Sequence, residues 1–253
     1  MAPNRTPMAM SKGGAVEFYG ATVDKPIRLT ASSAANAADF AVRNGYGDTT
    51  FAAPIYQTGE RFAINQEGGS TATFSGGGNF AGPVEFYPKS TAVRTVVVEG
   101  KPVVQPHPGT SDYGFKFCGK TELHLKCPGN RMYIGLGAET QGGGSALHCW
   151  TNDVLNYQCD IVLGYGSTMD LHGFDQQVGD LTAGVAGRVR SDEPATILAY
   201  YDNALTWGAN AGIDGAVTFR KSGPKQLTLN GTNTTSGALV AFAGPLVIGS
   251  TGC

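Results

Sequence analysis

The chain has 253 residues, of which 37 are glycine and only 15% are charged, and its formal net charge is −2. So few charged residues exclude the usual helical or α/β enzyme, in which Glu and Lys cover the helix surfaces. The Lys and Arg residues are scattered, so the sequence offers no positive patch for nucleic acid, and no apolar run is long enough for a membrane-spanning helix.

Short apolar runs separated by Gly, Asn, Asp and Pro follow one another along the whole chain, which is typical of an all-β protein. Most runs alternate apolar with polar residues. We therefore expect Leu227 and Leu229 to share one face of a strand and to be buried against Leu246 or Ile248 of a neighbouring turn. An alanine-rich stretch at residues 32–42 fits either a short helix or a loop and strand. The predicted strands cover residues 15–19, 26–30, 71–74, 84–87, 94–99, 121–126, 132–136, 161–165, 168–171, 195–200, 216–220, 226–229 and 238–248.

An internal repeat favours a stacked architecture. The sequence Val-Glu-Phe-Tyr occurs at residues 16–19 and again at 84–87, each time followed by a polar turn and another β-run. Repeats of this kind suit a solenoid, in which one turn buries its apolar face only against the next. We predict an all-β, right-handed parallel β-helix (solenoid), with a β-sandwich or barrel as the alternative. The predicted unit is single and elongated over residues 1–253, and a subdivision near residues 140–160 is the alternative.

Two consecutive motifs in the last third carry a family resemblance. Residues 171–174 read L-H-G-F and are followed by Q-Q-V-G-D-L-T-A-G at 176–184, while residues 221–233 read K-S-G-P-K-Q-L-T-L-N-G-T-N. This order resembles the passenger domains of bacterial autotransporters and their associated β-strand repeat. Pro224 and Thr234 depart from that repeat, which usually has a small residue and an aromatic residue there.

The resemblance covers residues 160–250 and implies a rung-by-rung β-solenoid. It also implies that the chain is a fragment of a larger bacterial protein, secreted or displayed on the outer cell surface. The function that it implies is a non-catalytic structural or adhesive module, whose partners are glycans or proteins of a host or of neighbouring cells.

The five cysteines leave two alternatives open. Cys118 and Cys127, and likewise Cys149 and Cys159, are separated by about ten residues, a spacing that adjacent turns or a hairpin can close to disulfide distance. Two such bridges would suit an oxidising compartment and would leave Cys253 unpaired. Buried, unbridged thiols explain the pattern equally well, because Cys127 is in phase with the apolar residues of its strand.

A zinc site among histidines and cysteines is disfavoured by the alternation of side chains along a strand. His124 and Cys127 have the spacing of a zinc half-site, but they lie on opposite faces of one predicted strand, and the adjacent His148 and Cys149 are opposed in the same way. We therefore predict solvent-facing histidines, no metal site and no cofactor.

Aspartates supply the enzymatic alternative. Asp160, Asp170, Asp175 and Asp180 follow one another at short intervals, and two carboxylates on consecutive turns would suit a secreted hydrolase. Such a pair serves as acid and base in a glycoside hydrolase or lyase, or shares a proton as in an aspartic peptidase. Aspartates are also common at solenoid corners, so the sequence alone leaves both explanations open.

Aromatic residues are the candidates for ligand binding. Trp150, Tyr157, Tyr200, Tyr201 and Trp207 fall in or beside predicted turns of the second half of the chain. Exposed rings of this kind form flat surfaces on which sugars stack. The sequence thus predicts a glycan-binding surface module, with the aspartate-dependent hydrolase as the alternative.

Overall fold

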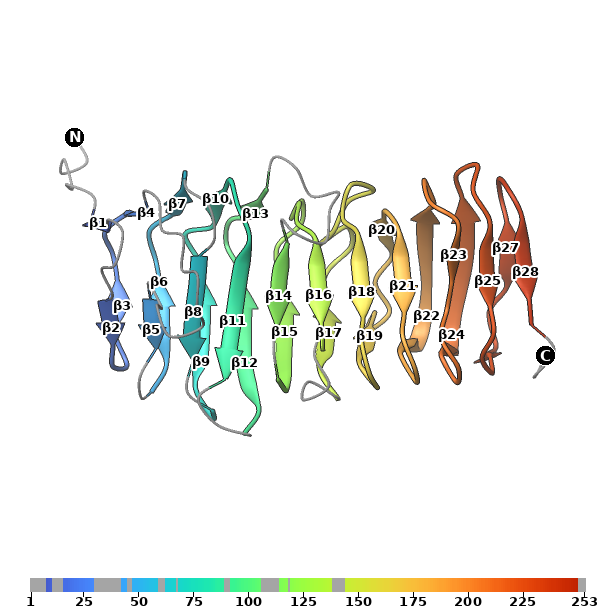
Figure 1. Cartoon of the computed structure of the whole chain (residues 1–253), viewed down its shortest axis with the longest axis horizontal. Coiled ribbons are helices and arrows are strands. Elements are labelled where there is room, and N and C mark those ends of the chain that lie inside the picture. The colour runs from blue at the N-terminus through green and yellow to red at the C-terminus, as the bar shows by residue number, and fades with distance from the viewer. Residues whose placement is uncertain are drawn as a thin grey trace.

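The computed structural model describes residues 8–10, 16–29, 42–44, 47–58, 62–66, 68–88, 92–105, 114–117, 119–137 and 144–249. Within these ranges all regular structure is β-strand, and the strands form four parallel sheets. Strands of successive turns lie side by side along the long axis, with the first described strand, β1, and the last, β28, at opposite ends of the stack (Figure 1). The predicted parallel β-helix is confirmed.

Four sheets of unequal size make up the solenoid. The five-stranded sheet holds β1 (Met8–Met10), β4 (Ile27–Leu29), β7 (Ile55–Gln57), β10 (Gly78–Phe80) and β13 (Val103–Val104). The eight-stranded sheet holds β2 (Val16–Phe18), β5 (Val42–Asn44), β8 (Phe62–Gln66), β11 (Val84–Pro88), β14 (Phe115–Phe117), β16 (Ile134–Leu136), β18 (Ile161–Leu163) and β21 (Leu181–Ala183). The twelve-stranded sheet holds β3 (Thr22–Val23), β6 (Thr49–Phe51), β9 (Thr71–Phe74), β12 (Arg94–Val98), β15 (Thr121–Leu125), β17 (Ala146–Cys149), β19 (Thr168–Asp170), β20 (Gln176–Val178), β22 (Arg188–Tyr200), β24 (Gly212–Ser222), β26 (Thr234–Thr235) and β27 (Leu239–Ala241). The three-stranded sheet holds β23 (Leu205–Thr206), β25 (Leu227–Leu229) and β28 (Leu246–Ile248).

The core is a continuous stack of inward-facing apolar side chains. Phe51 stacks on Phe74 with ring centroids 5.1 Å apart, and Phe86 stacks on Phe117 at 4.7 Å. All four rings are buried, and each one contributes about 1.5–3 kcal/mol relative to an exposed ring. Parallel pairing in register brings such residues together, because it places equivalent positions of successive turns one above the other.

The Val-Glu-Phe-Tyr repeat lies in one sheet, as a stacked architecture requires. Both copies contribute strands, β2 and β11, to the eight-stranded sheet. Val16 pairs with Val42, which pairs with Ile64, which pairs with Phe86, so the two copies are offset by two residues along the strand. An offset of two preserves the face on which each side chain lies.

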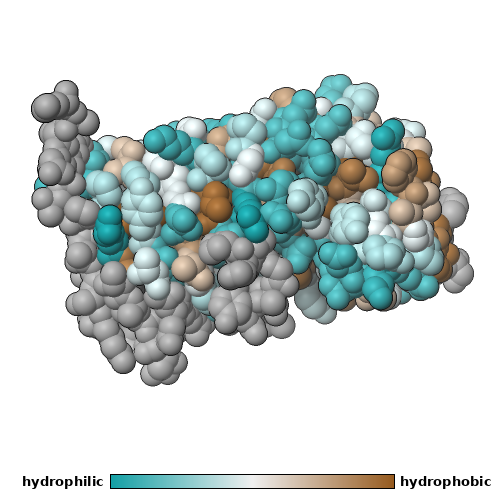
Figure 2. Space-filling view, turned by 90° about the horizontal axis from the view of Figure 1, so that it is seen from above, coloured by the Kyte–Doolittle hydropathy of each residue, from teal (hydrophilic) through white to brown (hydrophobic). Residues whose placement is uncertain are grey.

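The predicted phase of the C-terminal strands is confirmed. Leu227 and Leu229 are fully buried and pair with Leu246 and Ile248 of the next turn. Side chains of the last turn are less covered, and Phe242 is 75% exposed. Where the residues are described, one face of the molecule is mostly hydrophilic, with larger hydrophobic patches toward the C-terminal end (Figure 2).

Of the two alternatives left open for the cysteines, the disulfide bridges are wrong for the three residues that the structure describes. Cys127, Cys149 and Cys159 are unbridged and buried. Cys149 pairs in register with Leu125 of the preceding turn, so its thiol occupies an ordinary core position of the inward face. Cys118 and Cys253 lie outside the described residues. The alternative of buried free thiols is therefore correct for these three residues, and the cysteines give no support for an oxidising compartment.

These thiols are expected to resist alkylation in the native protein. Burial raises the pKa of Cys159 to about 11 and raises that of Cys149 further, so almost no thiolate, the reactive form, is present at pH 8. We predict that mass spectrometry after native alkylation finds Cys127, Cys149 and Cys159 unmodified. After denaturation without reductant, all three cysteines should react. If two of them react only after reduction, they form a disulfide bridge, and the assignment of free thiols is wrong.

Three further sequence predictions concern a short helix, a subdivision of the chain and membrane-spanning helices. Most of the helix candidate at residues 32–42 lies outside the described residues. Near residues 140–160, β17 pairs with β15 on one side and β19 on the other, so the twelve-stranded sheet continues through that region. No helix that is long and apolar enough to span a membrane occurs in the described part of the chain.

Candidate functional site

A column of titratable and charged side chains crosses the outer wall of the twelve-stranded sheet. His124 on β15 pairs with His148 on β17, which pairs in turn with Asp170 on β19. Asp170 pairs with Arg190 on β22, and Arg190 pairs with Asp214 on β24. Each residue therefore lies directly beside its counterpart on the next turn, within reach of its side chain.

Strand alternation explains why this column faces outward. Leu147 and Cys149 are fully buried, and His148 between them points to the opposite face of the strand. Leu123 and Leu125 flank His124 in the same way. The predicted opposition of histidines and cysteines is confirmed. The prediction considered only neighbours within one strand, however, and it overlooked contacts between turns.

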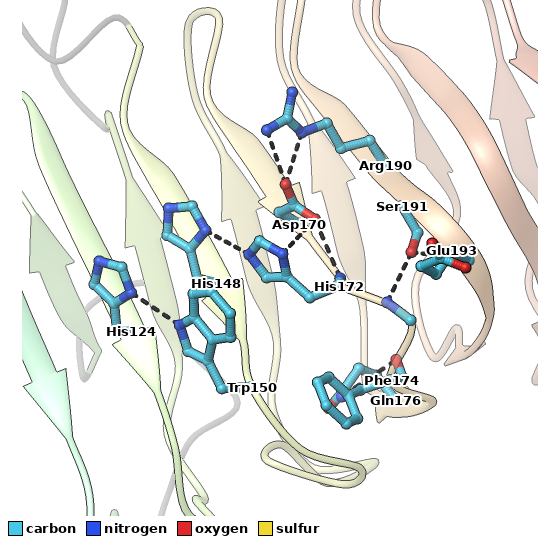
Figure 3. A network of polar contacts seen from close by, with 11 residues as sticks. His124, His148, Trp150, Asp170, His172, Phe174, Gln176, Arg190, Ser191 and Glu193 are labelled. Carbon is cyan, nitrogen blue, oxygen red and sulfur yellow. Dashed lines mark hydrogen bonds and ion pairs between the residues drawn. The ribbon is translucent and has the colours of Figure 1, made fainter.

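Four aromatic rings, which we call the aromatic row, stack on this wall: His124, His148, Trp150 and His172 (Figure 3). The centroids of His124 and His148 are 4.5 Å apart, those of His148 and His172 are 5.1 Å apart, and those of Trp150 and His172 are 4.1 Å apart. The ring planes of these pairs lie within 21° of parallel. Stacking of this kind is a favourable arrangement for aromatic rings.

Hydrogen bonds fix the rings in the row. The indole Nε1 of Trp150 donates to Nδ1 of His124 at 2.9 Å, and Nδ1 of His148 lies 2.9 Å from Nε2 of His172. A carboxylate oxygen of Glu122 lies 3.6 Å from Nε2 of His124. The rings are therefore oriented by edge contacts as well as by stacking, which pre-organises the surface.

Asp170 connects the row to an ion pair. Its Oδ2 accepts a hydrogen bond from Nε of Arg190 at 2.9 Å and forms an ion pair with Nη2 of the same residue at 2.8 Å. Its Oδ1 accepts the backbone N–H of His172 at 3.1 Å and lies 3.6 Å from Nδ1 of the same histidine (Figure 3). The carboxylate is buried, so these partners replace the water that it has lost.

Two of the imidazoles, His148 and His124, are shifted toward their neutral form. Burial, followed by repulsion from His124 and His172, lowers the pKa of His148 to about 4. Burial also lowers the pKa of His124, although Glu122 opposes that shift. His148 is therefore uncharged at neutral pH and carries a free lone pair on one ring nitrogen.

The other candidate aspartates hold successive turns together. Asp160 Oδ1 accepts the backbone N–H of Asp180 at 2.8 Å, and Asp180 Oδ1 accepts that of Asp202 at 3.1 Å. Asp175 Oδ1 accepts the N–H of Thr196 at 2.6 Å. Asp160 and Asp180 are thus in contact across consecutive turns, whereas Asp175 is bonded to a different segment, at Thr196. Burial, with a smaller contribution from the Asp180 charge, raises the pKa of Asp160 to about 6.

This raised pKa predicts how Asp160 changes stability with pH. Its folded pKa exceeds the unfolded value of 3.8, so the carboxylate opposes folding increasingly as the pH rises from about 4 to 6. In Asp160→Asn, an amide oxygen still accepts the Asp180 N–H. We expect urea unfolding to find the variant more stable by about 1 kcal/mol at pH 8, a value reduced for partial solvent exposure, and equal to wild type at pH 4. A difference that is independent of pH would contradict this account.

Two of the five predicted ligand-binding aromatics lie in the core. Tyr201 and Trp207 are fully buried, and both donate side-chain hydrogen bonds to the carbonyl oxygen of Leu181, at 2.9 and 2.8 Å. Both were predicted to bind a ligand at the surface, but their rings are core residues with no exposed face. Leu181 belongs to β21, the last strand of its sheet, and the two side chains satisfy a buried carbonyl there.

The remaining three predicted aromatics are exposed: Trp150 at 41%, Tyr157 at 61% and Tyr200 at 40%. Of these, Trp150 belongs to the aromatic row. His172 and Arg190 belong to the same site and were missed from the sequence. One signal was present, because His124, His148 and His172 recur at equal intervals of 24 residues, about one turn.

Comparisons with protein-family models, with curated proteins and with solved structures find no match for this chain.

Proposed function

We propose that the chain is a non-catalytic structural and adhesive module of a secreted or surface-exposed bacterial protein, and that its aromatic row binds glycans. The observation that carries this proposal is the exposed Trp150 ring, held parallel to His172 at 4.1 Å and anchored to His124 by its indole N–H. A flat ring whose orientation is fixed before binding costs little conformational entropy when a sugar stacks on it.

The carboxylates support a non-catalytic role. Asp175 and Asp180 accept backbone hydrogen bonds from the next turn, and Asp170 is paired with Arg190. Through these contacts the aspartates link successive turns of the solenoid, which is a structural role. The bacterial surface location rests on the resemblance of residues 160–250 to autotransporter passenger domains.

A glycan array with the purified chain tests the proposal. We expect the wild type to bind a defined set of glycans and Trp150→Ala to lose that binding. Tyr165→Ala is the matched control, because Tyr165 is 57% exposed but lies outside the aromatic row, and it should bind as the wild type does. If all three proteins bind glycans equally, the aromatic row is not the binding site. If the wild type binds no glycan on the array, the proposal of glycan binding is wrong.

The hydrolase alternative rests on one specific observation, the raised pKa of Asp160 beside Asp180. A general acid of this kind would protonate a leaving group near neutral pH. If the chain releases reducing sugars from a polysaccharide and Asp160→Asn stops the release, the chain is a hydrolase and the proposed adhesive function is wrong.

A further inference from the structure

We propose that Nδ1 of His148 and Nε2 of His172 form a binding site for a divalent transition-metal ion of the zinc class. These two nitrogens face each other across 2.9 Å, from adjacent turns of the solenoid. A tetrahedral zinc ion with nitrogen ligands at about 2.0–2.1 Å holds two of them about 3.3 Å apart. The two nitrogens need to separate by only a few tenths of an ångström. Each ring must also turn so that its lone pair points to the ion, and solvent completes the coordination sphere. The proposal does not depend on glycan binding.

Asp170 gives His172 the orientation that this site requires. Its Oδ1 lies 3.6 Å from Nδ1 of His172, and Arg190 holds the other carboxylate oxygen at 2.8 Å. A histidine ligand commonly turns its second nitrogen toward a carboxylate, which keeps the proton on that nitrogen and leaves the other one free for the metal. Asp170 is therefore a positioning residue, and His172 presents Nε2 to the ion.

The proton balance is simple. With the proton of His172 on Nδ1, its Nε2 accepts the hydrogen bond and Nδ1 of His148 donates it. When the ion takes the place of this hydrogen bond, the proton of His148 moves from Nδ1 to Nε2 of the same ring. No proton leaves the protein, and two nitrogen–metal bonds replace one hydrogen bond.

The donor set favours one class of metal. Imidazole nitrogens suit zinc, copper and nickel ions, whereas Ca²⁺ and Mg²⁺ require several oxygen ligands. A second group, Glu122 with His124 and His148, also lies close together. It is the weaker choice, because Nδ1 of His124 accepts the indole N–H of Trp150. The neutral ring therefore carries its proton on Nε2, the nitrogen that faces Glu122.

Trp150 supplies a local readout. Its ring is 4.1 Å from that of His172, and the chain contains two tryptophans, of which Trp207 is fully buried. A Cu²⁺ ion at the proposed site should therefore quench the fluorescence of Trp150 and leave that of Trp207 largely unchanged.

The test combines calorimetry with Zn²⁺ at pH 7.4 and fluorescence quenching with Cu²⁺ on the full chain. We expect one Zn²⁺ site in the wild type, no heat with Ca²⁺, and an affinity about tenfold or more weaker in His148→Gln and His172→Asn. Asn is chosen because His172 has a φ of 48°, which Asn tolerates. His124→Gln is the matched control and should keep the site. Far-UV circular dichroism confirms that each variant is folded.

Three results would overturn the proposal: a wild type that does not bind Zn²⁺, equal binding of Ca²⁺, or equal losses in His124→Gln and His172→Asn. Asp170→Asn tests the positioning role separately. In the metal-free protein, the ring ¹⁵N shifts of His172 should lose their preference for the Nδ1-protonated form, a change that a merely structural role would not produce.

Discussion

Replacing Leu229 with Asp is expected to destabilise the protein by about 4 kcal/mol or more, which would unfold the C-terminal turns. Leu229 is fully buried on β25, and it pairs with Ile248 of the next turn. An unpaired carboxylate would enter a core that is lined by apolar side chains and would lose its hydration there. Urea unfolding followed by circular dichroism measures the loss.

Thr228→Asp is the matched control for this change. Thr228 lies on the same strand but on its outer face, where a carboxylate stays hydrated. The expected loss is below about 0.5 kcal/mol. If the two variants are equally stable, the phase of β25 is wrong and its leucines do not face the core.

Replacing Gly231 with Ala is expected to cost about 3 kcal/mol, because two turns approach each other too closely there for a side chain. A methyl group on Gly231 would clash with the backbone carbonyl of Ala211 on the preceding turn. Backbone atoms cannot rotate away as the end of a long side chain can. The two turns would have to separate, which weakens their pairing.

Gly129→Ala distinguishes this steric effect from backbone strain. Gly129 has a φ of +79°, and among the described residues no heavy atom beyond Gly129 and its two chain neighbours lies within 4 Å of the position that its methyl group would take. Only the left-handed backbone conformation opposes the change, at about 1–2 kcal/mol. A larger loss in Gly129→Ala than in Gly231→Ala, measured by urea unfolding, would contradict the close packing of turns.

The fold could be predicted because its signals are local. Alternation along single strands indicated the correct inward phase for Leu227 and Leu229, and the outward phase for His124. The same reasoning placed Cys127 in phase with the core. It did not decide between a bridge and a buried thiol, because that choice depends on which residue of the next turn lies opposite.

The candidate site could not be predicted in the same way, because the turns differ in length. His148 lies opposite Asp170 rather than opposite His172, which reaches His148 diagonally from two residues further along the chain. The equal spacing of the histidines is therefore insufficient to assign contacts. The hydrolase alternative included Asp170 among the candidates for a catalytic pair, but its nearest charged partner is Arg190.

Tyr201 and Trp207 show a different limit of prediction from sequence. Their burial follows from the end of the eight-stranded sheet at β21, where the Leu181 carbonyl needs hydrogen-bond donors. Nothing in a local pattern indicates where a sheet ends. An aromatic residue that satisfies a buried carbonyl and one that faces a ligand therefore look alike in sequence.

The central claim is that parallel stacking of turns assembles the aromatic row from residues far apart in the chain. Nuclear Overhauser measurements between ring protons test this claim most directly. We predict contacts between His124 and His148, between His148 and His172, and between Trp150 and His172, whose centroids are 4.5, 5.1 and 4.1 Å apart. If these ring contacts are absent from a folded sample, the turns do not stack in this register and the site does not exist.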